Sequence, residues 1–152
     1  MTTTGDRHRL PGDAVPSHYT IRLEPGLDRA DFRGEVEIEL TVGAPIEALV
    51  CNAHDLEILS AELSTGSGPA RPLEATLDPD RERVSFTDGA TIPAGAHTLS
   101  VRFTGALNDR LVGFYRSTFT DPNGVARTLA TTQFEATHAR QAFPCWDEPQ
   151  FK

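Results

Sequence analysis

The sequence contains few residues of the types that mark specialised proteins. Only two cysteines, Cys51 and Cys145, occur among its 152 residues. A disulfide-stabilised secreted domain needs more cysteines, and a CxxC metal or redox motif needs them closer together. We therefore predict that both side chains are ordinary reduced thiols.

Basic residues are also scarce. The chain has 14 Lys and Arg against 22 Asp and Glu, which gives a formal net charge of −8. Such a chain lacks the positive surface that attracts nucleic acid or an anionic membrane. No apolar run approaches a membrane span, and residues 1–15 lack the apolar region of a secretory signal. The sequence predicts no nucleic-acid partner, no membrane partner and a cytoplasmic location.

Short motifs for common chemistry are missing too. No two histidines lie three to five residues apart, so an HExxH motif is absent; the five are His8, His18, His54, His97 and His138. No Cys/His cluster has zinc-ligand spacing, and no glycine-rich phosphate loop occurs. We therefore predict that no metal is bound within this chain.

The clearest positive signal is a strict alternation over residues 32–42. Apolar Val36, Ile38 and Leu40 are separated by Glu37 and Glu39. A helix would spread the glutamates around its circumference, so the period of two indicates a strand with one solvent-facing side.

Further short runs predict more strands, separated by turn residues rich in Gly and Pro. These runs cover residues 19–23, 48–51, 56–63, 83–86, 98–103, 114–119 and 127–134. Many short strands without a helical period predict an antiparallel all-β sandwich. Only the tail differs: residues 135–141 are expected to hold one helical turn, and Asp147-Glu148-Pro149 has the composition of a helix start.

Two features near the C-terminus suggest chemistry. His138, Cys145 and Asp147 lie close in sequence, but the apolar setting Phe143-Pro144-Cys145-Trp146 favours an inert, packed cysteine over a nucleophile. Glu135 lies where the strand signal ends and a helical turn is expected to begin. Its pattern fits either a helix-capping acid or a carboxylate in a binding site.

Residues 132–149 read TQFEATHARQAFPCWDEP. This segment strongly resembles the signature of the aminopeptidase N family of zinc metalloaminopeptidases, in which T-Q-[FCM]-E is followed by A-R and F-P-C-[FWL]-D-E-P. Residues 10–11, 16–19, 32–34 and 111–117 also resemble family segments, so the resemblance covers nearly the whole chain from about Leu10 to Lys152.

The resemblance implies an N-terminal, saddle-like all-β domain that packs against a thermolysin-like catalytic domain of the same polypeptide. It implies that Glu135 binds the free α-amino group of a peptide substrate and that Gln133 helps to line the pocket for the first side chain. The family's G-x-M-E-N loop, zinc ligands and catalytic tyrosine would lie beyond Lys152. The 152-residue chain is thus expected to carry no catalytic or metal residue of its own, to bind no zinc and to be inactive alone.

Three segments are expected from these observations: a polar arm (residues 1–13), an all-β domain (residues 14–134) and the signature segment (residues 135–152) that starts the catalytic domain. The alternative is a β-sandwich module that binds or scaffolds without catalysis, as in relatives with altered active sites. Epoxide-hydrolysing relatives carry glutamine at the position of Glu135, so the glutamate favours an aminopeptidase.

Overall fold

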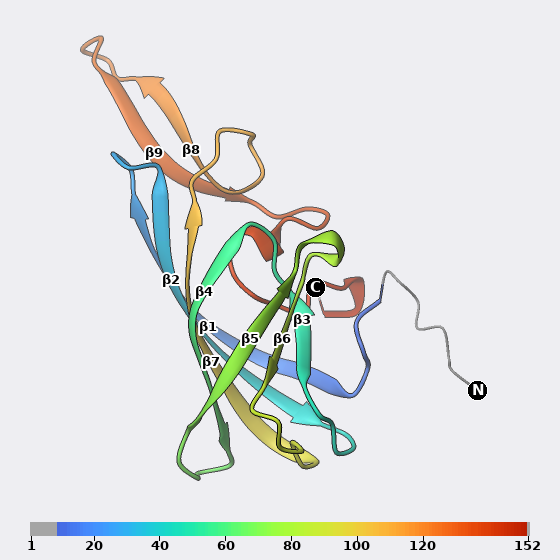
Figure 1. The fold of residues 1–152 in the computed structure, drawn as a ribbon. Helices are drawn as coiled ribbons and strands as arrows, with labels where there is room; N and C mark the ends of the chain where they lie inside the picture. The colour runs from blue at the N-terminus through green and yellow to red at the C-terminus, as the bar shows by residue number, and fades with distance from the viewer. Residues whose placement is uncertain (1–8, 152) are drawn as a thin grey trace.

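The chain is built almost entirely of β-strands (Figure 1). The computed structural model describes residues 9–151. Within them the strands are β1 (Ala14–Gly26), β2 (Asp31–Val42), β3 (Leu49–Asn52), β4 (Leu56–Thr65), β5 (Arg71–Asp78), β6 (Arg83–Thr87), β7 (Gly95–Ala106), β8 (Gly113–Thr120) and β9 (Ala126–Gln133). Three 3₁₀ helices complete the set: η1 (Pro79–Arg81), η2 (Ala139–Gln141) and η3 (Pro149–Phe151).

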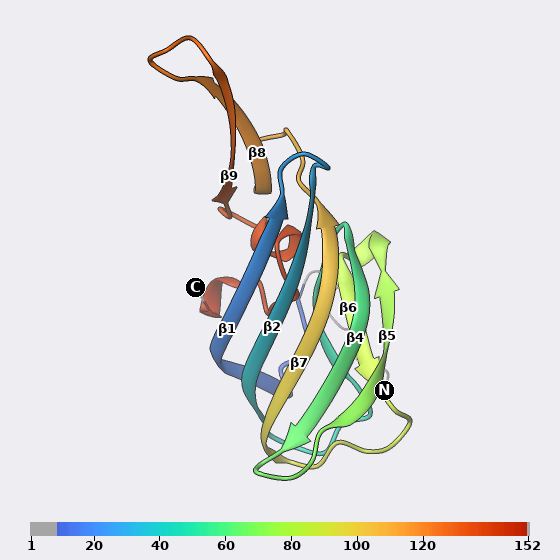
Figure 2. The same ribbon diagram turned by 90° about the vertical axis from the view of Figure 1, so that its left-hand side faces the viewer.

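Seven strands form one antiparallel sheet in the order β1-β2-β7-β4-β5-β6-β3. The sheet bends at β5, where the pairing partner changes along the strand. Leu73 pairs with Ala61 of β4, whereas Leu77 pairs with Val84 of β6. The two parts of the sheet therefore face each other, and the C-terminal segment lies on the concave side between them (Figures 1 and 2).

Strand β2 shows how the sequence pattern produces the core. Its residues alternate between buried and exposed from Phe32 to Val42, with the glutamates outside. Val36, Ile38 and Leu40 pack on the concave side among the fully buried residues. Gly34 lies opposite Phe103 of β7, and a Cβ at this glycine would sit 2.3 Å from the Phe103 ring. The missing side chain thus makes room for an aromatic one.

Strands β8 and β9 form a separate two-stranded sheet that projects beyond the main one (Figures 1 and 2). Phe114 anchors its base, because its ring packs edge-on against Phe32 at 5.0 Å between centroids. A two-stranded hairpin is marginal by itself in water, so such anchoring is needed to hold it.

The predicted all-β antiparallel, sandwich-like fold is confirmed, and each predicted strand is present. Strand β5 was not predicted, because Pro72 and flanking turn residues obscure the alternation of Leu73, Ala75 and Leu77. The expected helical turns appear as the 3₁₀ helices η2 and η3.

The division into arm, β domain and signature segment stays a prediction, and residues 1–8 of the arm lie outside the described residues. Leu10, Ala142 and Trp146 all belong to the same buried cluster as the sheet. No helix among residues 9–151 is both long enough and apolar enough to cross a membrane.

Candidate functional site

The segment that follows β9 runs across the concave side of the sheet. It leaves the sheet after Gln133, forms η2, and returns to the sheet where Cys145 makes an isolated bridge with Asn52 of β3. The Asn52 N–H donates to the Cys145 carbonyl at 2.8 Å, and the Cys145 N–H donates to the Asn52 carbonyl at 3.0 Å. The segment is therefore joined to an edge strand by main-chain hydrogen bonds.

Side chains of the sheet extend this attachment. The Asn52 Oδ1 accepts from the Asp147 N–H at 3.2 Å, and the Tyr19 hydroxyl of β1 accepts from the Trp146 N–H at 3.0 Å. The Leu10 N–H donates to the Glu148 carboxylate. Each of these contacts satisfies a main-chain or side-chain polar group that packing removes from water.

Arg140 is the charged centre of the attachment. Its Nε lies 3.1 Å from Asp147 Oδ2, and its Nη1 lies 3.0 Å from Glu82 Oε2. The Asp147 side chain is only 1% exposed and that of Arg140 is 13% exposed. Because removing Arg140 would take the ion-pair partner away from the buried Asp147 carboxylate, this pair is expected to be essential for docking.

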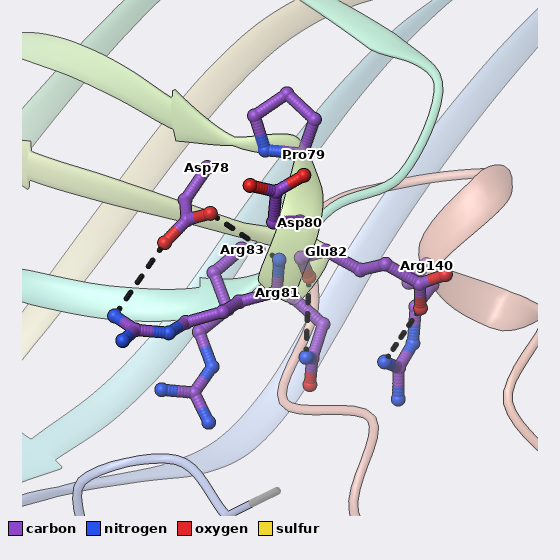
Figure 3. A pocket seen from close by; sticks show the side chains of 8 residues that line it. Asp78, Pro79, Asp80, Arg81, Glu82, Arg83 and Arg140 are labelled. Carbon is purple, nitrogen blue, oxygen red and sulfur yellow. Dashed lines mark hydrogen bonds and ion pairs between the residues drawn. The ribbon is translucent and has the colours of Figure 1, made fainter. Parts of the chain in front are cut away.

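A groove of about 770 Å³ lies beside this ion pair, between residues 78–83 and Arg140 (Figure 3). Figure 3 shows Arg140 and Glu82 facing each other, with Asp78 bonded to Arg81 on the far side. Two ion pairs, Asp78 with Arg81 and Glu82 with Arg140, thus line the groove, and the second of them connects the sheet to the C-terminal segment.

A second hollow, of about 540 Å³, contains both of the residues predicted to contact substrate, Gln133 and Glu135. Five of its eleven lining residues are aromatic, and Phe143 packs edge-on against Tyr19 at 6.1 Å and against Phe134 at 5.8 Å between ring centroids. Glu135 thus lies beside an apolar surface that could receive a hydrophobic group.

The side chains of Gln133 and Glu135 remain accessible, since both residues are exposed. The Gln133 amide donates to the main-chain carbonyl of Glu135 at 3.4 Å, and the Glu135–Ala136 peptide bond is cis. Glu135 makes no ion pair with another described residue. Its carboxylate can therefore accept hydrogen bonds from a cationic ligand.

Burial keeps two other ionisable groups near the site neutral. The pKa of the Tyr19 hydroxyl is raised chiefly by burial, and burial also raises the pKa of the Cys51 thiol. Both cysteines are buried and neither forms a disulfide among the described residues, which agrees with the prediction of reduced thiols. Asp147 pairs with Arg140, and Cys145 is buried, an arrangement that agrees with the packed cysteine favoured by the sequence.

Gly113 permits the close approach of η2 to the hairpin. Its φ is +71°, and a Cβ there would lie 2.7 Å from Gln141 Oε1 and 2.8 Å from Gln141 Cβ. A side chain at this position would meet both backbone strain and a steric clash.

Sequence reasoning missed the residues that hold the segment in place. Asn52 and Glu82 carry no local signal, because their partners Asp147 and Arg140 lie 95 and 58 residues away in the chain. Residues 9–151 contain no group of three His, Cys, Asp or Glu side chains placed to hold a metal ion.

Comparison with known proteins gives a consistent picture. Residues 15–152 match the family described as Peptidase M1 N-terminal domain. The chain is 42% identical over 148 residues to aminopeptidase M1-A of Oryza sativa subsp. japonica, which covers 95% of the chain and 17% of that protein. It is 41% identical over 145 residues to the puromycin-sensitive aminopeptidase of Caenorhabditis elegans, covering 95% of the chain and 15% of that protein.

A third relative is endoplasmic reticulum aminopeptidase 1 of Homo sapiens, at 35% identity over 148 residues, covering 95% of the chain and 16% of that protein. The chain thus spans between 15% and 17% of the length of these curated relatives.

Proposed function

The chain belongs to the peptidase M1 N-terminal domain family, and we propose that it supplies the substrate-anchoring part of a zinc-dependent aminopeptidase. Such an enzyme removes amino acids from the free N-terminus of peptides. In this proposal the chain carries Glu135 and Gln133, and the remainder of a longer polypeptide carries the zinc site and the residues that cleave the peptide bond.

The observation that carries the proposal is the position of Glu135. Its exposed carboxylate lies at a hollow that is lined in part by five aromatic residues, and it makes no ion pair with another described residue. A peptide N-terminus presents an ammonium group next to a side chain that is often apolar. A charge-assisted hydrogen bond between the ammonium and Glu135 would contribute about 1.5–3 kcal/mol.

Anchoring the ammonium also selects the bond to be cleaved. When the first residue is held at Glu135, only the first peptide bond can reach the catalytic groups. Gln133 lies at the same hollow, two residues earlier in the chain, and is assigned the contact with the first side chain. Together, Glu135 and Gln133 would thus recognise the free N-terminus of a peptide and position its first residue.

Zinc does not fit the residues that the structure describes. Among residues 9–151 no three potential ligands converge, so we derive no step through a metal here. The metal would be held by residues of the longer protein, and the 152-residue chain alone is proposed to be inactive. The partners in this proposal are peptides with a free N-terminus and a thermolysin-like catalytic domain of the same polypeptide.

A cytoplasmic location is part of the same proposal. Cys51 and Cys145 are both buried and form no disulfide among the described residues, as expected in a reducing compartment. Location of a fluorescent fusion of the full-length protein in a membrane-bound organelle would contradict it.

The test of the anchoring role is the substitution Glu135→Ala in the full-length protein. We expect kcat/KM for an amino-acid arylamide to fall about 10- to 100-fold, because the lost charge-assisted bond is realised in the transition state as well as on binding. Glu37→Ala is the matched control, since Glu37 is an exposed carboxylate on the outer face of β2.

Unchanged kinetics for Glu135→Ala would refute the amine-binding role. The alternative function, a non-catalytic binding or scaffolding module, predicts that purified full-length protein holds no stoichiometric zinc and releases no arylamine. Metal analysis and the arylamide assay therefore separate the two functions.

A further inference from the structure

Asparagine occurs three times in the chain, and two of the three side chains are held in place. Asn52 is 5% exposed; its amide nitrogen donates to a main-chain carbonyl at 3.3 Å, and its oxygen accepts from a main-chain N–H at 3.2 Å. Asn108 likewise donates at 3.0 Å and accepts at 2.8 Å. Ala53 and Asp109 follow them in the chain. A side-chain amide that is bonded at both ends is not free to turn toward the main-chain nitrogen of the next residue.

Asn123 differs from both of these residues. It is exposed, and its side-chain amide makes no hydrogen bond to another residue within the range 9–151. The next residue is Gly124, which has a φ of +80° and no atom within 4 Å of the position that a Cβ would take. Glycine has no side chain to block the approach to its main-chain nitrogen, and it adopts backbone conformations that other residues avoid. Asn123 thus combines a free amide with an unobstructed neighbour.

The turn that carries Asn123 connects β8 to β9 at the far end of the projecting hairpin (Figures 1 and 2). In the closed turn the Gly124 N–H donates to the Asp121 carbonyl at 2.9 Å. The Asp121 carboxylate accepts from the N–H groups of Asn123 and Val125 at 2.9 Å and 3.0 Å. These bonds are exposed to solvent, and the end of a two-stranded hairpin opens at a low cost in free energy. Opening of the turn releases the Gly124 nitrogen.

We propose that Asn123 is a site of spontaneous deamidation, which converts it to isoaspartate and aspartate. In the open turn the Gly124 main-chain nitrogen attacks Asn123 Cγ, and the bond from Cγ to the side-chain nitrogen breaks. The proton of the Gly124 N–H leaves with that nitrogen as ammonia, and a five-membered succinimide ring remains. Water then adds to either ring carbonyl and opens the ring. In sum, one amide and one water become one carboxylate and one ammonium ion, and the reaction does not depend on the proposed function.

The product changes both the charge and the main chain of the turn. The hydrogen bond from the Val125 N–H holds the pKa of Asp121 below its ordinary value, so the new carboxylate joins one that is already charged. Isoaspartate also adds a methylene group to the main chain between Asp121 and Gly124. The hydrogen bonds that close the turn depend on that spacing. We therefore expect deamidation to loosen the hairpin.

The test incubates the full-length protein at mildly alkaline pH, where the Gly124 nitrogen loses its proton more readily, and follows its tryptic peptides by mass spectrometry. Residues 117–127 form the peptide that contains Asn123, whereas residues 34–81 and 103–110 contain the other two asparagines. We expect the mass increase of an amide that becomes an acid in peptide 117–127 alone. Methyl transfer to this peptide by an isoaspartyl methyltransferase should confirm the isoaspartate.

Gly124→Ala tests the role of the glycine. A Cβ beside the attacking nitrogen hinders ring closure, so the rate at Asn123 should fall about tenfold. Gly89→Ala is the matched control, because Gly89 has a φ of +81° and also has no atom within 4 Å of its Cβ position. It should leave the rate at Asn123 unchanged. Synthetic peptides of residues 117–127, with and without the alanine, give the same comparison in the absence of the fold.

Hydrogen exchange of residues 113–133 measures the consequence for the hairpin. Amide exchange in the deamidated protein should be about tenfold faster than in the unmodified protein, because the turn no longer closes in the same way. Asn123→Asp is the matched control for charge alone, since it adds the carboxylate but keeps the normal main chain. It should give a smaller increase.

Two results would overturn the proposed modification. One is an Asn123 amide that persists in the protein after the synthetic peptide has converted completely. The other is equal conversion at Asn52 and Asn108, which would show that exposure and the following glycine do not select the site. Unchanged hydrogen exchange after conversion would overturn the expected loosening of the hairpin.

Discussion

Within residues 133–148, the first part and the second part differ in what they contact. Residues 139–148 are bonded to the sheet through Arg140, Cys145, Trp146 and Asp147, and most of these residues are buried. Residues 133–138 include the exposed Gln133 and Glu135, and the Gln133 side-chain amide donates to the main-chain carbonyl of Glu135. One continuous motif thus contains a structural part and a part left open to a ligand.

This difference teaches that the most specific residues of a motif need not perform chemistry. The arginine, cysteine and aspartate that make the signature recognisable fasten it to β3 and to the residue after η1. Their effect on function would be indirect, because they hold the segment in the position that places Glu135 at the hollow. The comparison can be tested by measuring how strongly each half supports stability.

The largest effect is expected for Arg140→Ala. Loss of the guanidinium leaves the buried Asp147 carboxylate without its ion-pair partner, which should lower the free energy of unfolding by about 3–5 kcal/mol. Urea unfolding followed by fluorescence of Trp146, the single tryptophan, measures it.

Arg102→Ala is the matched control for Arg140→Ala. Arg102 lies 3.0 Å from Glu35, but the two side chains are 69% and 50% exposed. Its removal should cost less than about 1 kcal/mol. Equal losses for the two variants would show that the buried ion pair of Arg140 and Asp147 stabilises the fold no more than an exposed ion pair does.

A smaller effect is expected for alanine at Gly113. Alanine at Gly124, where φ is +80° and no atom lies within 4 Å, should cost about 1–2 kcal/mol through backbone strain alone. Gly113→Ala adds the clash with Gln141 and should cost about 1–3 kcal/mol more. Urea midpoints at constant slope measure both. Identical costs would show that η2 does not depend on this close contact.

The smallest effect concerns pH and Tyr19. Because burial raises the pKa of the Tyr19 hydroxyl, the unfolded chain loses this proton near its ordinary pKa of about 10 while the folded chain keeps it. The unfolded state then binds fewer protons, so stability is complete below about pH 10 and falls above it, by at most about 1.4 kcal/mol per pH unit.

Tyr19→Phe should remove that part of the alkaline decline. At neutral pH it should cost about 1 kcal/mol, since the Trp146 N–H loses its acceptor. Unfolding free energies at pH 8, 10 and 11 measure the change, and parallel pH profiles for Tyr19→Phe and the wild type would contradict the buried hydroxyl.

The sequence predicted the fold well wherever local patterns decide structure. Strand β2 was predictable because its alternation faces a core on one side and water on the other. Strand β5 was not predicted, because Pro72 and flanking turn residues obscure its alternation. The strand also pairs with β4 at one end and with β6 at the other, and a local sequence pattern does not indicate such a change of pairing partner.

The candidate site was predictable only in part. Gln133 and Glu135 were identified from a resemblance, and their substrate roles stay predictions. The ties that hold the segment join residues from 58 to 138 positions apart, such as Glu82 with Arg140 and Leu10 with Glu148. Such pairs depend on the three-dimensional fold, and single-residue chemistry gives no indication of them.

The long separation between Tyr19 and Trp146 also has a consequence for biosynthesis. Tyr19 leaves the ribosome 127 residues before its partner does. At roughly 5–20 residues per second, the wait lasts about 6–25 s. During that interval Phe143 is not yet available to pack against the Tyr19 ring, so the nascent sheet is expected to expose apolar surface that a chaperone can bind.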